Sequence, residues 1–282
     1  MSHCTIQNAL QEAQQQLTVL PETRPRLEAE ILLGFALGRP RSHLYAWPER
    51  PLEADRWAHF STLVARRIQG EPIAYITGQR EFWSLDLQVT PETLIPRPET
   101  ELLAELALEL IPPGRPFNIA DLGTGSGAIA AAIASERPDC TLFATDLSEA
   151  ALQVARGNFK HLDLANIQTR SGSWCDALPR NQPFDLIISN PPYIPDGDPH
   201  LAQGDLPWEP RAALASGRDG LDDIRCIIRQ APNHLSAGGW LLLEHGYNQG
   251  SKVHALFKTH GFKQVSTQQD LTGQDRITMG QF

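Results

Sequence analysis

The stretch "DLGTGSG", residues 121–127, decides how this 282-residue chain folds. The apolar sequence "FNIA" precedes it and the alanine-rich sequence "AIAAAIASERP" follows it, so the pattern predicts a buried strand that turns into a helix. Glycine at every second position permits positive φ angles and lets a ligand touch the backbone. The start of the following helix offers free N–H groups. The spacing is not that of a dinucleotide loop, nor that of a P-loop, since no lysine follows. The alternative is an ordinary tight turn.

Strands and helices alternate from about residue 95 to the end of the chain. This order predicts an α/β domain with a largely parallel sheet covered on both faces. Ligands of such sheets bind beyond the carboxyl ends of the strands, so those ends are where a site is expected. Helices are predicted at 100–111, 128–138 and 148–162, and strands at 117–123, 141–147, 167–174, 184–190, 239–246, 262–270 and 276–282.

The first part of the chain differs in character. Three segments, 5–17, 22–38 and 53–70, place apolar residues three and four positions apart, which is typical of helices. Residues 75–89 contain the turn-like Gly78 and then alternate apolar with polar residues, which favours a β-hairpin. We therefore predict a helical domain at 1–72, a hairpin linker at 73–94 and an α/β domain at 95–282.

Charge and cysteine usage limit the function classes. Residues 1–72 carry eight arginines and eight acidic residues, so the whole net charge of −9 falls on residues 73–282. Such a charge disfavours a protein that grips nucleic acid directly. The four scattered cysteines, without a C-x-x-C pair, indicate a reduced cytoplasmic protein and argue against a zinc site. The longest apolar runs are too short to cross a membrane.

Two further strand ends carry candidate ligand-binding side chains. Asp146 ends the second predicted strand of the α/β domain, 23 residues after Gly123, where an acidic residue can accept hydrogen bonds from ribose hydroxyls. A solvated aspartate that helps Ser148 to cap the next helix is the alternative. Trp174 is predicted to end the third strand, where its indole can lie against an adenine ring. A core tryptophan with its N–H bonded is the alternative.

The sequence "ISNPPYIP" at 188–195 ends another predicted strand on Asn190. Pro191 and Pro192 lack N–H groups, so the turn is stiff and rich in acceptors. The side-chain carbonyl of Asn190 and the main-chain carbonyl of Pro191 suit a planar NH₂ group, which has two hydrogens to donate. Tyr193 can pack its ring on the plane of that group. The alternative is a proline-terminated strand with asparagine as a turn former.

These motifs together resemble a known family. D-x-G-x-G-x-G resembles the cofactor loop of class I S-adenosylmethionine-dependent methyltransferases. N-P-P-Y resembles the motif of those methyltransferases that act on planar exocyclic or amide nitrogens. With "GEPIAYITGQREF" (70–82), "IPRPETELL" (95–103) and "WEPRAALASGRDGL" (208–221), the chain is similar to the peptide chain release factor N5-glutamine methyltransferases of HemK type. The resemblance implies a Rossmann-like sheet of seven mostly parallel strands, preceded by a helical bundle that recognises the substrate.

The resemblance also implies roles for residues. Asn190, Pro191, Pro192 and Tyr193 would hold the substrate glutamine. S-adenosylmethionine, released as S-adenosylhomocysteine, would be bound by Gly123, Thr124, Gly125, Ser126, Gly127, Asp146, Trp174 and Asn190. Thr100 and Glu101 belong to the family signature, but the resemblance assigns them no chemical role.

The expected reaction is methylation of the glutamine of the Gly-Gly-Gln motif in class 1 release factors. It needs no metal, because the sulfonium itself carries the leaving group. Three alternatives remain at the level of sequence. They are an adenine-N6 DNA methyltransferase, a methyltransferase acting on a ribosomal-protein glutamine or an rRNA base, and a cofactor-binding regulatory module without catalysis.

Overall fold

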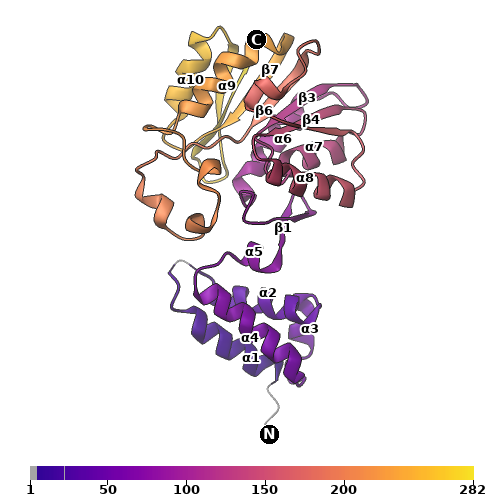
Figure 1. Ribbon diagram of the computed structural model, residues 1–282, viewed down its shortest axis with the longest axis vertical. Coiled ribbons are helices and arrows are strands. Elements are labelled where there is room, and N and C mark those ends of the chain that lie inside the picture. The colour runs from indigo at the N-terminus through magenta and orange to yellow at the C-terminus, as the bar shows by residue number, and fades with distance from the viewer. Residues whose placement is uncertain (1–4, 22) are drawn as a thin grey trace. The chain divides into compact units, whose positions relative to one another are not determined.

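The computed structural model describes residues 5–21 and 23–282 (Figure 1). Cys4 therefore lies outside the described residues. The chain divides into two compact units: the first runs to Gln79 and includes Ala202–Trp208, and the second comprises Arg80–Leu201 and Glu209–Phe282. Within the described ranges, no helix is both long and apolar enough to cross a membrane.

Helices build the first unit. The ends of its helices follow local signals. The Thr5 hydroxyl caps the first helix by accepting a hydrogen bond from the Asn8 N–H. Pro25 begins the second helix, and Gly38 ends it in the left-handed conformation. Buried apolar side chains such as Leu32, Leu33 and Phe60 form its core. The helices run at Ile6–Leu17 (α1), Pro25–Leu37 (α2), Arg41–Ala46 (α3), Ala54–Ile68 (α4) and Ile73–Thr77 (α5).

The predicted hairpin is present as β1 (Gln79–Phe82) and β2 (Leu85–Gln88). Its turn is formed by Trp83 and Ser84, both at positive φ (54° and 58°), as the right-handed twist of a two-residue hairpin requires. Gly78 lies outside the hairpin, because it ends α5 in the left-handed conformation.

The second unit is built on one sheet with the strand order β5-β4-β3-β6-β7-β9-β8. The pairs from β5 to β7 are parallel, and β9 runs antiparallel to both of its neighbours. The strands are Asn118–Leu122 (β3), Thr141–Asp146 (β4), Ile167–Ser171 (β5), Phe184–Ser189 (β6), Leu235–Glu244 (β7), Lys263–Gln269 (β8) and Asp275–Gln281 (β9).

Helices cover both faces of this sheet (Figure 1). Neighbouring strand residues point to opposite faces, so Ile119 packs in the core under α6 (Glu101–Leu110), α7 (Ala128–Glu136) and α8 (Glu149–His161). Ala120 packs instead under α9 (Asp222–Gln230) and α10 (Gly250–Thr259). The helices α9 and α10 were both absent from the sequence prediction, although Ile224, Ile227 and Ile228 of α9 have helical spacing and are buried.

Candidate active site

The register of the parallel strands brings four strand ends into one row. Leu122 of β3 pairs with Thr145 of β4 on one side and with Ser189 of β6 on the other. Ser189 in turn pairs with Leu243 of β7. The next residues along these strands therefore meet at the carboxyl edge of the sheet: Asp146, Gly123, Asn190 and Glu244.

The glycine loop between β3 and α7 has the conformation that the sequence predicts. Gly123, Gly125 and Gly127 all have positive φ, at 70°, 57° and 85°. A Cβ on Gly127 would lie 2.5 Å from the Phe159 ring, so the loop passes close to α8. A Cβ on Gly125 would meet no atom within 4 Å, so this part of the loop borders open space.

Thr124 and Ser126 each form hydrogen bonds within the protein. Thr124 is buried, and its hydroxyl donates to Asp121 Oδ2 at 2.6 Å. Ser126 is also buried, and its carbonyl accepts a hydrogen bond from Asn158 Nδ2 at 2.8 Å. The Thr124 N–H donates to the Thr145 carbonyl, and the Thr124 carbonyl accepts from the Gly127 N–H, both at 2.8 Å. The contribution of Thr124 and Ser126 to cofactor binding therefore stays a prediction.

Asp121 lies beneath the loop as a fully buried carboxyl group. Its Oδ1 has no hydrogen-bond partner within the described part of the chain. Burial raises the pKa of Asp121 to about 7, and the nearby charge of Asp146 adds to the rise, while the hydrogen bond from Thr124 opposes it. Burial therefore favours the protonated form of this carboxyl group.

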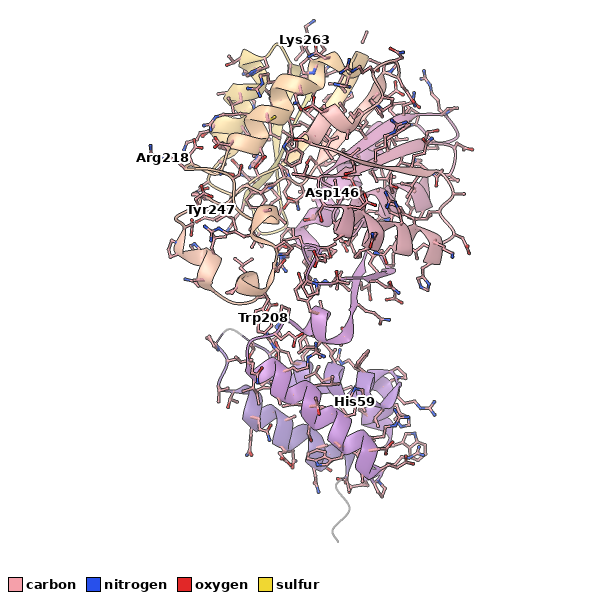
Figure 2. The ribbon with its side chains drawn as sticks, in the orientation of Figure 1. His59, Asp146, Trp208, Arg218, Tyr247 and Lys263 are labelled. Carbon is pink, nitrogen blue, oxygen red and sulfur yellow. The ribbon has the colours of Figure 1, made fainter. Side chains whose placement is uncertain are left out.

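Asp146, labelled in Figure 2, ends β4, as predicted. Its carboxylate links two turns. Oδ2 accepts a hydrogen bond from the Gly125 N–H and Oδ1 accepts one from the Ser148 N–H, both at 2.9 Å. Each oxygen has lone pairs for a second donor, so Asp146 can shape the loop and still accept hydrogen bonds from ribose hydroxyls.

Trp174 does not end a strand, and that prediction is wrong. The strand β5 ends at Ser171, and Trp174 begins a short 3₁₀ helix at a positive φ of 45°. The chain turns at Gly172, too early for the strand to reach the tryptophan. The indole N–H donates to Asp223 Oδ1 at 3.1 Å, and the ring lies against Gly123, where an added Cβ would be 3.1 Å from Cζ3. The structure nevertheless brings the indole to the loop.

The N-P-P-Y turn follows β6 directly, with Pro191 and Pro192 buried. Asn190 Nδ2 donates to Thr100 Oγ1 at 3.2 Å, and Asn190 Oδ1 receives no hydrogen bond from the residues that the structure describes. The Tyr193 hydroxyl donates to Glu244 Oε1 at 3.3 Å. Asn190 thus has its donor end engaged and its acceptor end available.

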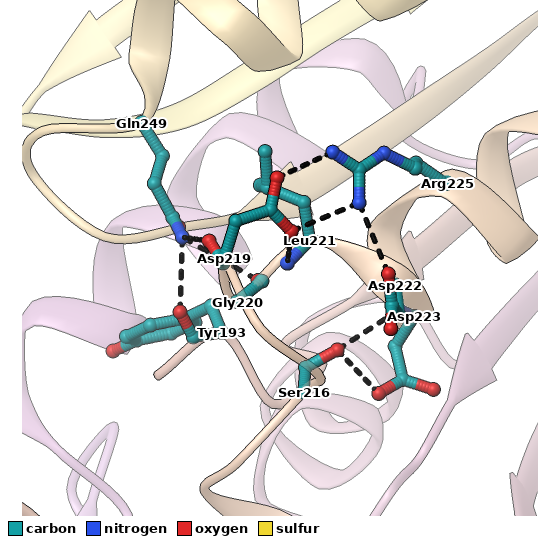
Figure 3. Close-up of polar contacts among 9 residues, drawn as sticks. All are labelled: Tyr193, Ser216, Asp219, Gly220, Leu221, Asp222, Asp223, Arg225 and Gln249. Atoms are coloured by element: carbon teal, nitrogen blue, oxygen red, sulfur yellow. Dashed lines mark hydrogen bonds and ion pairs between the residues drawn. The ribbon is translucent and has the colours of Figure 1, made fainter. Parts of the chain in front are cut away.

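The backbone of this turn is held by a buried glutamine that the sequence prediction did not identify. Gln249 Nε2 donates to the Tyr193 carbonyl at 3.0 Å and also approaches the carbonyls of Asp219 and Gly220 (Figure 3). A Cβ on Gly220 would lie 2.2 Å from the Tyr193 oxygen, so only glycine fits there. These contacts fix the position at which Tyr193 leaves the turn.

Glu209 holds the segment that carries Thr100. Its buried carboxylate accepts a hydrogen bond from the Ile95 N–H at 3.1 Å and forms an ion pair with Arg97. Glu209 and Arg97 come from the "WEPR" and "IPRP" sequences, so these two signatures meet in space.

Comparison with known proteins agrees with this architecture. The family model for the PrmC N-terminal domain matches residues 8–78, and the model for the methyltransferase small domain matches residues 100–204. A release factor glutamine methyltransferase of Coxiella burnetii is 50% identical over 273 residues, which are 97% of both chains. One from Escherichia coli is 47% identical over 276 residues, or 98% of both chains.

Solved structures show the same fold. A methyltransferase from Pyrococcus furiosus superposes with a TM-score of 0.53 at 20% identity, over 79% of this chain and 98% of that one. These matches confirm the predicted fold class. It is that of class I S-adenosylmethionine-dependent methyltransferases, with a helical region that precedes the sheet in the sequence.

The glycine loop and its surroundings fit S-adenosylmethionine. The open space beside Gly125 gives a ligand access to the backbone, and the uncapped start of α7 offers N–H donors. The Asp146 carboxylate suits ribose hydroxyls, and the indole of Trp174 offers a flat apolar surface beside Gly123. We propose that these residues hold the cofactor.

A methyl group on Gly125 tests this placement. We expect Gly125→Ala to weaken the binding of S-adenosylhomocysteine about tenfold or more, equivalent to ~1.4 kcal/mol, because the added Cβ fills the space that the ligand needs. Isothermal titration calorimetry measures this affinity. Gly114→Ala is the matched control, because Gly114 also has positive φ (68°) and open space around it. Equal affinities for both variants would contradict the placement.

Proposed function

Because this chain belongs to the release factor glutamine methyltransferase family, we propose that it methylates the glutamine of the Gly-Gly-Gln motif in class 1 release factors. The S–CH₃ bond of S-adenosylmethionine breaks as the bond from the methyl group to the side-chain amide nitrogen, N5, forms; S-adenosylhomocysteine leaves, and one of the two amide protons is released to water. The observation that carries the proposal is the Asn190 amide, whose Nδ2 is committed to Thr100 while Oδ1 remains an acceptor beside the glycine loop.

The chemical difficulty lies in the substrate amide. Its nitrogen lone pair is delocalised into the carbonyl, which is also why rotation about a peptide bond costs ~18–20 kcal/mol. Asn190 Oδ1 and the Pro191 carbonyl would accept the two amide hydrogens and so fix the orientation of the nitrogen. Tyr193 would pack against the amide plane. Positioning of this kind contributes several kcal/mol to lowering the barrier.

When bound, S-adenosylmethionine supplies an electrophilic methyl group on a sulfonium. Positive charge then develops on the glutamine nitrogen, and the N–H bonds become stronger donors. Asn190 Oδ1 and the Pro191 carbonyl hold these hydrogens more tightly at that moment than in the resting amide. Such acceptors act as preorganised electrostatic groups, because the buried prolines keep the turn rigid.

Other substrates that an enzyme with an N-P-P-Y turn could methylate are less well supported. An adenine-N6 DNA methyltransferase must flip its base and hold the phosphate backbone, yet residues 73–282 carry the entire net charge of −9. The named relatives act on release factors, not on a ribosomal protein, and an intact N-P-P-Y turn argues against a regulatory module. We therefore propose a cytoplasmic enzyme with a protein substrate and no direct nucleic-acid partner.

The decisive experiment offers labelled S-adenosylmethionine with release factor, ribosomes and DNA in separate reactions. We expect label only in the release factor, and mass spectrometry should place one additional methyl group on the glutamine of its Gly-Gly-Gln peptide. Label in DNA or ribosomes but not in the release factor would overturn the proposal.

Removal of the Asn190 side chain tests the catalytic turn. We expect Asn190→Ala to lower kcat by at least ~100-fold, because the amide loses a preorganised acceptor, while the affinity for S-adenosylhomocysteine changes little. Steady-state kinetics and calorimetry give the two values. Asn181→Ala, at an exposed position, is the control. An equal loss of turnover and cofactor affinity would mean that Asn190 mainly holds the cofactor.

We infer that the helical domain provides a second contact surface for the release factor. Large apolar side chains are exposed on this domain: Tyr45 of α3 is 53% exposed, Phe35 of α2 42%, and Trp47, just after α3, 59%. Exposed apolar side chains favour protein binding when they form a contiguous patch, and Tyr45 and Trp47 are only two residues apart in the chain. Stabilisation or dimerisation of the protein is the competing role.

Trp47→Ala separates these roles. We expect it to raise the KM for an intact release factor about tenfold and to leave the KM for a short Gly-Gly-Gln peptide unchanged, because the peptide reaches only the catalytic turn. Leu271→Ala is the control, since Leu271 is a fully exposed apolar residue of the second unit. Similar changes for both substrates would argue for a purely structural role.

A further inference from the structure

Asp223, in the first turn of α9, connects two parts of the second unit that meet at the candidate site. Its Oδ1 accepts a hydrogen bond from the Trp174 indole N–H at 3.1 Å. Its Oδ2 accepts one from the Ser216 hydroxyl at 2.6 Å (Figure 3). A carboxylate can accept at both oxygens at once. One side chain therefore joins the tryptophan beside the glycine loop to a segment that follows the N-P-P-Y turn.

The first of these bonds restrains the indole of Trp174. The residue has a φ of 45°, which residues other than glycine rarely adopt, so its backbone conformation needs support from tertiary contacts. The ring lies against Gly123, where an added Cβ would be 3.1 Å from Cζ3, and the N–H is bonded to Asp223. Removal of Asp223 would take the acceptor from the N–H of a partly buried ring and would permit the ring to rotate away from the loop.

The second bond restrains a segment, residues 214–217, that pairs with the chain just after Tyr193. The Ile194 N–H donates to the Leu214 carbonyl, and the Ser216 N–H donates to the Ile194 carbonyl, both at 2.9 Å. This pairing directs the chain as it leaves the N-P-P-Y turn. The position of the Tyr193 ring, which is proposed to pack on the substrate amide, therefore depends on where segment 214–217 lies.

Ser216 fastens that segment to α9. It is 2% exposed, and besides donating to Oδ2 its hydroxyl accepts a hydrogen bond from the Asp223 N–H at 2.9 Å. Leu221, at the cap position of α9, has no side-chain acceptor of its own, so the serine satisfies one of the N–H groups at the start of the helix. Ile224 of the same helix is buried in the core of the second unit. The segment is thus attached to a rigid element.

We propose that Asp223 is a positioning residue for both the methyl donor and the substrate amide. Through Oδ1 it keeps the indole of Trp174 at the glycine loop, and through Oδ2 it holds Ser216 and with it the course of the chain after Tyr193. Methyl transfer requires the donor and the amide nitrogen to be aligned at close range, and small displacements of either lower the rate strongly. This inference rests on the proposed function and on the proposed placement of the cofactor.

Substitutions in the full-length protein test each connection. Asp223→Ala should lower the affinity for S-adenosylhomocysteine about fivefold and lower kcat with a Gly-Gly-Gln peptide about tenfold, because both partners lose their acceptor. Ser216→Ala keeps the backbone pairing and removes the hydroxyl, so kcat should fall about tenfold while the affinity for S-adenosylhomocysteine stays within about twofold. Trp174→Phe keeps a flat ring and removes the N–H, so this affinity should fall about fivefold.

Double-mutant cycles distinguish positioning from a general effect on stability. When Trp174→Phe is already present, Asp223→Ala should change the affinity for S-adenosylhomocysteine less than about twofold further, because the bond it removes is already lost. When Ser216→Ala is already present, Asp223→Ala should likewise change kcat less than about twofold further. A merely structural role would lower the melting temperature and give additive losses in both cycles.

Asp222→Ala is the matched control. Asp222 is an exposed acidic residue in the same first turn of α9, and its carboxylate pairs with Arg225 at 3.0 Å. Both measured values should stay within about twofold of wild type. Additive losses in either cycle, or a wild-type value of kcat or of affinity in Asp223→Ala, would overturn the proposal. If the wild-type enzyme binds S-adenosylhomocysteine but leaves release factor and peptide unmethylated, the proposed function fails instead.

Discussion

An amide side chain can accept hydrogen bonds only at its oxygen, and the proposed active site of this protein depends on which end of Asn190 carries that oxygen. The bond from Nδ2 to Thr100 decides the orientation. Glutamine, the proposed substrate, presents an NH₂ group with two donors and therefore needs acceptors. Prolines at 191 and 192 remove two competing donors from the same turn. The turn thus discriminates by polarity as well as by shape.

The sheet makes this local chemistry possible, because parallel pairing places strand ends at one edge. Leu122 and Ser189 are partners in the register, so the glycine loop and the N-P-P-Y turn leave the sheet side by side. The pairing of β4 with β3 places Asp146 at the same edge, and the pairing of β7 with β6 places Glu244 there. The residues proposed to bind the cofactor and those proposed to bind the substrate therefore need no long side chains to reach one another.

The site also concentrates groups that are unfavourable for stability. Asp121 and Glu244 are both buried carboxyl groups whose pKa is raised to about 7. Three glycines of one loop have positive φ, and Trp174 shares that strained region of backbone without being glycine. Such features are retained where function requires them, and here Asp121 and Glu244 lie at the carboxyl ends of β3 and β7.

The sequence by itself determined most elements of the fold and the two principal motifs. Hydrophobic periodicity identified the long helices and the strands, and the glycine loop, Asp146 and N-P-P-Y were recognisable because each is a short, contiguous pattern. Only the tertiary structure decided what lies next to these motifs. Thr100 meets Asn190 across 90 residues of chain, and Glu244 meets Tyr193 across 51. Trp174 was misplaced, and Glu244 and Gln249 were overlooked, because strand register and long-range contacts bring them to the site, and neither leaves a local pattern in the sequence.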